Sequence, residues 1–338
     1  MDKIQSDIRD VPLAVAARGG LAENVHRGRI AVVSADDGRV LESIGDAEAL
    51  TYTRSTAKPL QAIASLLAGV DEACGWGARH LAMMAASQRG YPEQVAALEE
   101  MLASSGVPEE ALAFHAAKPT ASRPREGWAR SGLPPRKLYY TCAGKHLGML
   151  AWCRREGWPL EGYLEPDHPA QREILRRVRE WTGAAAEDCA VGRDGCGLPT
   201  LAVPLRAIAL GYARLAIPDA APDPKAAVVA AKVADAMNRH PDLVEGPGRL
   251  ASLLLADLNL VAKSGAQGAF AIGLRRQRLG IAVHVSDGTE AAWPYIVMQL
   301  LERYGGASEE TMAALRSRFP ATFRNDADME AGSWEAVF

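Results

Sequence analysis

The chain has 338 residues, 48% of them hydrophobic, so it can bury a large core, and a disordered chain is excluded. Its net charge of −3 and its dispersed arginines exclude a nucleic-acid surface built on basic charge. No stretch reaches the ~18 apolar residues that a membrane span requires, and residues 1–10 lack the apolar segment of a secretion signal. These features predict a cytoplasmic protein without membrane contacts.

Short β-strands are predicted at the start of the chain, at residues 13–17, 30–35 and 40–44. The last two flank Asp36-Asp37-Gly38, whose residue types favour a tight hairpin turn. The chain therefore opens with antiparallel sheet.

Helical spacing of apolar residues dominates the middle of the chain. The first helix is predicted at residues 58–68, where Pro59 suits a first helical turn. The Pro-, Arg- and Gly-rich residues 119–135 are typical of a long irregular loop, and residues 217–225 of a surface connection. Further helices are predicted at residues 78–85, 92–103, 145–156, 168–181, 201–215, 226–238 and 249–258.

Strands return near the C-terminus, at residues 260–262, 268–274 and 281–286, before a helix at 290–302. Strands at both ends of a helical middle predict an α+β fold. Its antiparallel sheet is built from both termini, at about residues 10–50 and 258–300, and its large helical part covers about residues 55–257. We expect a single catalytic domain over residues 1–338.

Lysine is scarce in this chain, with eight lysines against thirty arginines. A lysine is informative where chemistry needs an amine that can lose its proton, because a guanidinium does not do so. Ser55 lies three residues before Lys58, so on a helix the two side chains share a face. A serine beside a lysine that burial holds neutral is an activated nucleophile. Taken alone, however, the tetrapeptide is equally well explained as a plain helix start.

A second lysine motif, Lys263-Ser264-Gly265, follows a predicted strand start near the C-terminus. Serine-lysine acyl-transfer enzymes pair Ser-x-x-Lys with Lys-Ser/Thr-Gly on a strand that lines the same cleft. Lys263 would supply a cationic edge for a substrate carboxylate or a base for another hydroxyl; the alternative is a surface strand end. Ser87, before a glycine turn, could reach such a cleft, but it is also an ordinary residue for a helix start.

Five cysteines without a secretion signal favour reduced thiols or metal ligands over disulfides. Cys142 and Cys196 lie near glycines, which permit close backbone approach, and two thiolates suit a borderline metal such as zinc. A further donor is needed, and Lys145 or His146 could provide it. Two buried structural cysteines are the alternative interpretation, which the spacing alone favours.

In combination and in order, these segments resemble the asparaginase II family, the class 3 or rhizobial-type L-asparaginases. The resemblance runs from about residue 13 to residue 300. It rests on Arg18-Gly19-Gly20, Glu23-Asn24-Val25-His26-Arg27-Gly28, Arg54-Ser55-Thr56-Ala57-Lys58-Pro59, Ser87 with its glycine turn, Cys142-Ala143-Gly144-Lys145-His146, Asp194-Gly195-Cys196-Gly197 and Lys263-Ser264-Gly265-Ala266-Gln267-Gly268.

The resemblance implies a fold similar to serine β-lactamases and serine glutaminases, and typically a homodimer. It also implies two serine-lysine pairs, Ser55 with Lys58 and Ser87 with Lys263.

A zinc ion near the substrate is implied as well, held by Cys142, Lys145 and Cys196 together with water. In this family the metal is thought to position the substrate. The residues implied to support the site and bind substrate are Arg54, His146 and Asp194.

Several neighbours of these residues differ from the family pattern. Thr141 and Ala143 stand where Asn and Ser usually flank the first zinc cysteine. Gln88 and residues 91–94 replace an expected His and a Glu-Pro-x-His run, and residues 248–252 replace Arg-Phe-Asp-Thr.

These observations predict an L-asparaginase, which hydrolyses the side-chain amide of L-asparagine to L-aspartate and ammonia, with Ser55 as nucleophile and Lys58 as base. One alternative is a glutaminase or another small-amide hydrolase on the same fold. Another is a non-catalytic ligand-binding relative, which the altered neighbours of Ser87 suggest. The absence of an export signal disfavours a penicillin-directed enzyme.

Overall fold

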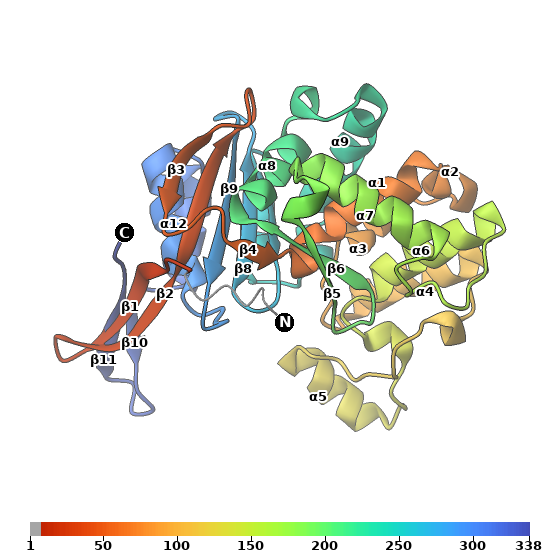
Figure 1. Cartoon of the computed structure of the whole chain (residues 1–338). Coiled ribbons are helices and arrows are strands. Elements are labelled where there is room, and N and C mark those ends of the chain that lie inside the picture. Colours follow the sequence, from red (N-terminus) through yellow and green to blue (C-terminus); the bar gives the residue numbers. More distant parts are fainter. Residues whose placement is uncertain (1–7) are drawn as a thin grey trace.

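The larger β-sheet of the protein is assembled from both ends of the chain, as the strand pattern predicts (Figure 1). The computed structural model describes residues 8–338; residues 1–7, part of the segment predicted to carry no secretion signal, lie outside the described residues. Within residues 8–338 the sheet has the order β10-β11-β1-β2-β9-β8-β7, with β3 also paired to β2, and its neighbouring strands are antiparallel. Its strands are β1 (Val11–Arg18), β2 (Leu21–Ser34), β3 (Val40–Ile44), β7 (Leu260–Ser264), β8 (Ala269–Leu274), β9 (Leu279–Val285), β10 (Thr322–Arg324) and β11 (Glu330–Ala336).

The predicted helical middle of the chain is confirmed, and it lies to one side of the sheet (Figure 1). Its helices are α1 (Lys58–Leu67), α2 (Val70–Cys74), α3 (Ala78–Met84), α4 (Pro92–Ser105), α5 (Ser122–Ser131), α6 (Ala143–Glu156), α7 (Pro169–Thr182), α8 (Leu205–Ala216), α9 (Pro224–Arg239), α10 (Pro241–Val244) and α11 (Leu250–Leu255). Two further helices, α12 (Trp293–Tyr304) and α13 (Glu309–Arg318), follow the last central strand. None of the helices in the described part of the chain is long and apolar enough to cross a membrane.

The helix predicted at residues 201–215 is wrong in its first part, because residues 199–204 form a strand, β6 (Pro199–Pro204). Every residue of β6 is buried, so the segment lacks the alternation of a half-exposed strand and its apolar run merges with that of α8. Together with β4 (Leu50–Tyr52) and β5 (Ala190–Arg193), β6 forms a second antiparallel sheet, in the order β4-β6-β5.

The irregular loop predicted at residues 119–135 is also wrong in part, because it contains α5. Pro124 lies in the first turn of this helix, where a missing N–H is tolerated, and Gly132 ends the helix with a φ of 68°. No residue of α5 is buried, so the helix has no apolar stripe for a periodicity argument to detect.

Both faces of the larger sheet are covered. Along β2, Ile30 and Val32 belong to the core beneath α12 and α13, whereas Ala31 and Val33 belong to the core shared with the helical part. Helix α8 lies directly on the second face, where a Cβ at Gly280 would fall 1.9 Å from the Ala209 carbonyl oxygen. This close approach requires glycine and fixes the helical part against the sheet.

Candidate active site

Lys58 begins α1 and is completely buried. Its amine donates hydrogen bonds to the Ala86 carbonyl oxygen at 2.7 Å and to Ser87 Oγ at 3.0 Å. Burial lowers the pKa of Lys58, and although the thiols of Cys142 and Cys196 oppose this, the net shift is downward. A buried amine with a lowered pKa and a serine hydroxyl as neighbour is the arrangement that general-base activation requires.

Ser55 lies one turn before Lys58, in a 3₁₀ turn over Arg54–Ala57, and its side chain is only partly buried. The residue before it, Arg54, has a φ of 46°, in the left-handed region that non-glycine residues rarely occupy. Arg54 Nε donates to Asp194 Oδ1 at 2.9 Å, which holds this turn against the loop that carries Cys196. Backbone strain at a site residue is common where a side chain must be presented to a ligand.

Lys263, on β7, is also completely buried, but its partner is a carboxylate. Its amine donates to Glu245 Oε1 and to the Ser264 carbonyl oxygen at 2.9 Å, with Ser264 Oγ at 3.4 Å. The same Glu245 oxygen accepts hydrogen bonds from the backbone N–H and the hydroxyl of Ser264. Burial lowers the pKa of Lys263, Glu245 raises it, and the result is about 8.

The structure therefore brings together the predicted serines and lysines but joins them differently. The hydrogen bond from Lys58 goes to Ser87, whereas the resemblance pairs Lys58 with Ser55 and Ser87 with Lys263. Lys263 is bonded to Glu245 instead, a residue that the sequence did not single out. The two lysine groups are linked through the backbone, because the Ser87 N–H donates to the carbonyl oxygen of Val244 at 2.7 Å.

The predicted metal residues lie side by side. Cys142 lies at the start of α6, and a hydrogen bond from the Cys196 thiol lowers its pKa despite burial. Lys145 Nζ lies 3.8 Å from Asp194 Oδ2, and Cys196 Sγ lies 3.9 Å from the same oxygen. Burial lowers the pKa of the Lys145 amine, but Cys196, Cys142 and Asp194 outweigh it, so the net pKa is raised.

Two buried thiols and a buried amine fit a thiolate-preferring metal in residue type. In residues 8–338, no group of three or more His, Cys, Asp or Glu side chains could hold a metal ion. A metal site with three protein donors here must therefore include the amine of Lys145. His146 is completely buried. Its Nδ1 shares a hydrogen bond of 2.7 Å with the Tyr163 hydroxyl, but its Nε2 has no hydrogen-bond partner in the described chain. A metal bound by these residues would require Lys145 to lose its proton, against the raised pKa of its amine.

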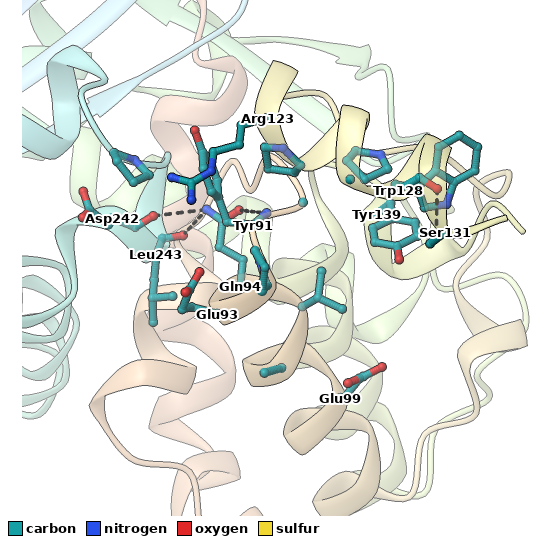
Figure 2. Close-up of a pocket in the computed structure, with 18 of the residues that line it drawn as sticks. Tyr91, Glu93, Gln94, Glu99, Arg123, Trp128, Ser131, Tyr139, Asp242 and Leu243 are labelled. Carbon is teal, nitrogen blue, oxygen red and sulfur yellow. Dashed lines mark hydrogen bonds between the residues drawn. The ribbon is translucent and has the colours of Figure 1, made fainter. Parts of the chain in front are cut away.

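The two glutamines that replace expected histidines after Ser87 are structural. Gln88 is completely buried; its amide nitrogen donates to the carbonyl oxygens of Leu138 and Tyr140, both at 2.8 Å, and its oxygen accepts from the Gly90 N–H. Gln94 makes an equivalent set of backbone hydrogen bonds at the start of α4, as Figure 2 shows in part. These amides hold the segment after Ser87 in place.

A large cavity of the described chain lies away from this cluster. It has a volume of about 850 Å³ and lies between the start of α4, helix α5 and residues 242–247, with Tyr91, Trp128 and Tyr139 among its lining side chains (Figure 2). None of the predicted catalytic or metal residues lines it. We therefore place the candidate site by its chemistry, at the buried lysines, rather than by cavity size.

The chain is similar to one family of known proteins. The family model of L-asparaginase II matches residues 14–336, nearly the whole chain. No curated protein matches the chain significantly. Among solved structures, a β-lactamase from Mycobacterium bovis has 16% identity and a TM-score of 0.38, covering 82% of this chain and 94% of that one.

A native structure of Mglu has 19% identity and a TM-score of 0.38, covering 90% of this chain and 64% of that one. The chain belongs to the L-asparaginase II family and is an amidohydrolase of the asparaginase type.

Proposed function

We propose that the protein hydrolyses the side-chain amide of L-asparagine to L-aspartate and ammonia by serine-lysine nucleophilic catalysis. The observation that carries the proposal is the completely buried Lys58, hydrogen-bonded to Ser87 and one turn from the partly exposed Ser55. A neutral amine in this position can exchange a proton with the Ser87 hydroxyl, and the partly exposed Ser55 lies one helical turn away.

Ser55 is the nucleophile in this mechanism because its hydroxyl is the more accessible of the two. Neutral Lys58 takes the proton of Ser55 as Ser55 Oγ forms a bond to the amide carbon. The Lys58 ammonium returns a proton through Ser87 to the amide nitrogen, and ammonia leaves as the C–N bond breaks. Water then attacks the ester, which releases L-aspartate and restores the Ser55 hydroxyl.

We further propose that Cys142, Cys196 and Lys145 bind one zinc ion. When bound, the metal would offer a Lewis-acidic point that orients a polar group of the substrate. Asp194 supports this arrangement by contacting both Arg54 and Lys145. Elemental analysis of the purified protein is expected to give one zinc per chain. The double variant Cys142→Ser with Cys196→Ser is expected to contain no zinc, and this readout does not require an activity assay.

A cytoplasmic homodimer is the expected form of this enzyme, by resemblance to its family. Its mass in solution, measured by light scattering, tests the dimer. Fractionation of producing cells tests the location.

The reaction is tested by ammonia release from L-asparagine, L-glutamine and small amides. We expect the highest kcat/KM with L-asparagine, and a loss of at least about a hundredfold in Ser55→Ala. Ser65→Ala is the matched control, because Ser65 is a buried serine of α1 whose hydroxyl bonds only to Ala62 within residues 8–338.

The proposal fails if Ser55→Ala releases ammonia from L-asparagine as fast as the unaltered chain. Faster turnover of L-glutamine or another amide would instead assign the glutaminase or small-amide alternative. The absence of turnover on any amide, with thermal stabilisation by L-aspartate intact, would assign a binding protein.

A further inference from the structure

Arg89 lies two residues after Ser87, in the irregular segment between α3 and α4. Its side chain is partly buried, and its Nε is fully buried without a hydrogen-bond partner in the described residues. No side chain between residues 8 and 338 forms an ion pair with its guanidinium. A buried guanidinium N–H without an acceptor is costly, which suggests that the acceptor is a bound molecule.

A second arginine nearby is in a similar state. Arg249 forms an ion pair with Glu290 through Nη2, but its Nε is also buried and unpartnered within residues 8–338. The two guanidinium groups repel each other: burial lowers the pKa of Arg89 and Arg249 lowers it further, against the smaller opposing effects of Glu245 and Glu290. Two like charges held close together favour an anion between them.

The local balance of charge points the same way. Three cations, Arg89, Arg249 and Lys263, are grouped around two carboxylates, Glu245 and Glu290. With Arg318, which lines the same hollow as Arg249, Glu245 and Glu290, the cations of this group outnumber its carboxylates, so a further carboxylate would be favoured there. Arginine suits this role because its planar fork donates two parallel hydrogen bonds to a carboxylate.

This group of charged side chains lies next to the proposed reaction centre at Lys58 and Ser87. Ser87 and Arg89 are separated by one residue, so their Cα atoms lie within roughly 7 Å of each other. Ser87 is also tied to Val244, next to Glu245, by a backbone hydrogen bond of 2.7 Å. Arg89 is therefore a near neighbour of Ser87, through which the proposed mechanism returns its proton.

We infer that Arg89, with Arg249 beside it, binds the α-carboxylate of the substrate, so that the enzyme selects amides that carry a free carboxylate. This inference rests on the proposed function, because it assigns the specificity of the same site. Arg89 is then a specificity-determining residue, and the family's Ser-Lys elements do not include it.

The fold of the segment does not depend on the Arg89 side chain. Its backbone N–H donates to Gln94 Oε1 at 2.8 Å, and its carbonyl oxygen accepts from the N–H groups of Thr120 and Ala121. Substitution of the side chain leaves these contacts in place, so variants at Arg89 are expected to fold.

The experiment compares L-asparagine with its α-amide, which differs only in lacking the carboxylate, and follows formation of L-aspartate and of isoasparagine by chromatography. We expect Arg89→Gln to lower kcat/KM for L-asparagine by about 10- to 100-fold, mainly through KM, while kcat/KM for the α-amide changes less than about twofold. Arg89→Lys is expected to recover part of the loss, because it keeps the charge without the fork. Arg123→Gln is the control, since Arg123 is an exposed arginine at the large cavity.

An equal effect of Arg89→Gln on both substrates, or no effect on L-asparagine, would overturn the inference. If the unaltered protein does not turn over L-asparagine, the proposed function fails separately. The inference is then tested by thermal shift: L-aspartate must stabilise the unaltered protein more than isoasparagine does, and Arg89→Gln must remove that difference. A difference that persists in Arg89→Gln would overturn it.

Discussion

Lys58 and Lys263 are both completely buried, yet their partners differ in charge. Lys58 bonds to two uncharged oxygens, one of them a serine hydroxyl that can exchange a proton with it. Lys263 directs its N–H groups to Glu245 and Ser264, and within residues 8–338 no hydrogen bond joins it to Ser87. Burial removes water from both amines, but a neighbouring carboxylate favours the charged form of an amine, whereas uncharged oxygens do not.

The largest expected effect concerns the proposed base. Lys58→Met is expected to lower kcat by about 10²- to 10⁴-fold, because proton removal from the nucleophile is lost. Its stability should change little, since the amine bonds to uncharged groups. Steady-state ammonia release and urea unfolding of the same sample measure both quantities. Retention of more than a tenth of the activity would remove Lys58 from the mechanism.

Breaking the ion pair between Lys263 and Glu245 is expected to lower the stability of the fold. Lys263→Met or Glu245→Gln leaves one charged group buried alone, which costs about 3–5 kcal/mol. The double variant Lys263→Met with Glu245→Gln removes both charges and should recover much of that loss. Urea unfolding midpoints of the unaltered protein, the two single variants and the double variant give the coupling energy between Lys263 and Glu245. Additive losses would show that the pair does not stabilise the fold.

Acid should weaken the contribution of Glu245 to the stability of the fold. Burial alone would raise its pKa, but Lys263 outweighs burial and holds the pKa at about 2, below its usual value of 4.5. A carboxyl with a depressed folded pKa stabilises the fold above its unfolded pKa and stops doing so as the pH falls. The stability difference between the unaltered protein and Glu245→Gln should therefore shrink by about 3 kcal/mol between pH 5 and pH 2. A constant difference over that range, measured by urea unfolding, would contradict the ion pair.

The smallest effect concerns Ser264, whose hydroxyl donates to Glu245. Ser264→Ala is expected to cost about 1–2 kcal/mol in urea unfolding, because a hydrogen bond to a charged acceptor is lost. Ser252→Ala is the matched control: Ser252 is equally buried, but its hydroxyl bonds to the uncharged Pro241 carbonyl oxygen. If the control loses as much stability as Ser264→Ala, the charge on Glu245 adds nothing to this contact.

The sequence predicted the architecture well where a helix or strand buries one face, because the spacing of its apolar residues then shows a period. The strands at residues 40–44 and the helices beginning at 58, 78 and 92 agree with the structure. It failed where burial is uniform, as in β6, and where it is absent, as in α5, because neither leaves a periodic pattern. Strands β10 and β11 and helix α13 were not predicted, and they extend the sheet past the expected limit at residue 300.

For the site, local motifs located Ser55, Lys58 and Lys263, but not their partners. Spacing along a helix predicts which side chains share a face, whereas the bond from Lys58 to Ser87 joins residues 29 positions apart. Glu245 was overlooked because a glutamate before Gly246-Pro247-Gly248 is typical of an exposed turn. Its partner lies 18 residues further on, so no local pattern marks it as a buried ion.

The construction of the sheet from both ends of the chain also has a consequence for biosynthesis. Strand β2 is completed at residue 34, but the strand that covers its inner edge, β9, begins only at residue 279. At a synthesis rate of about 5–20 residues per second, the edge of β2 waits on the order of tens of seconds for its partner. During that time an apolar strand edge is open to other nascent chains, so the yield of this protein should depend on how well the cell shields its first strands.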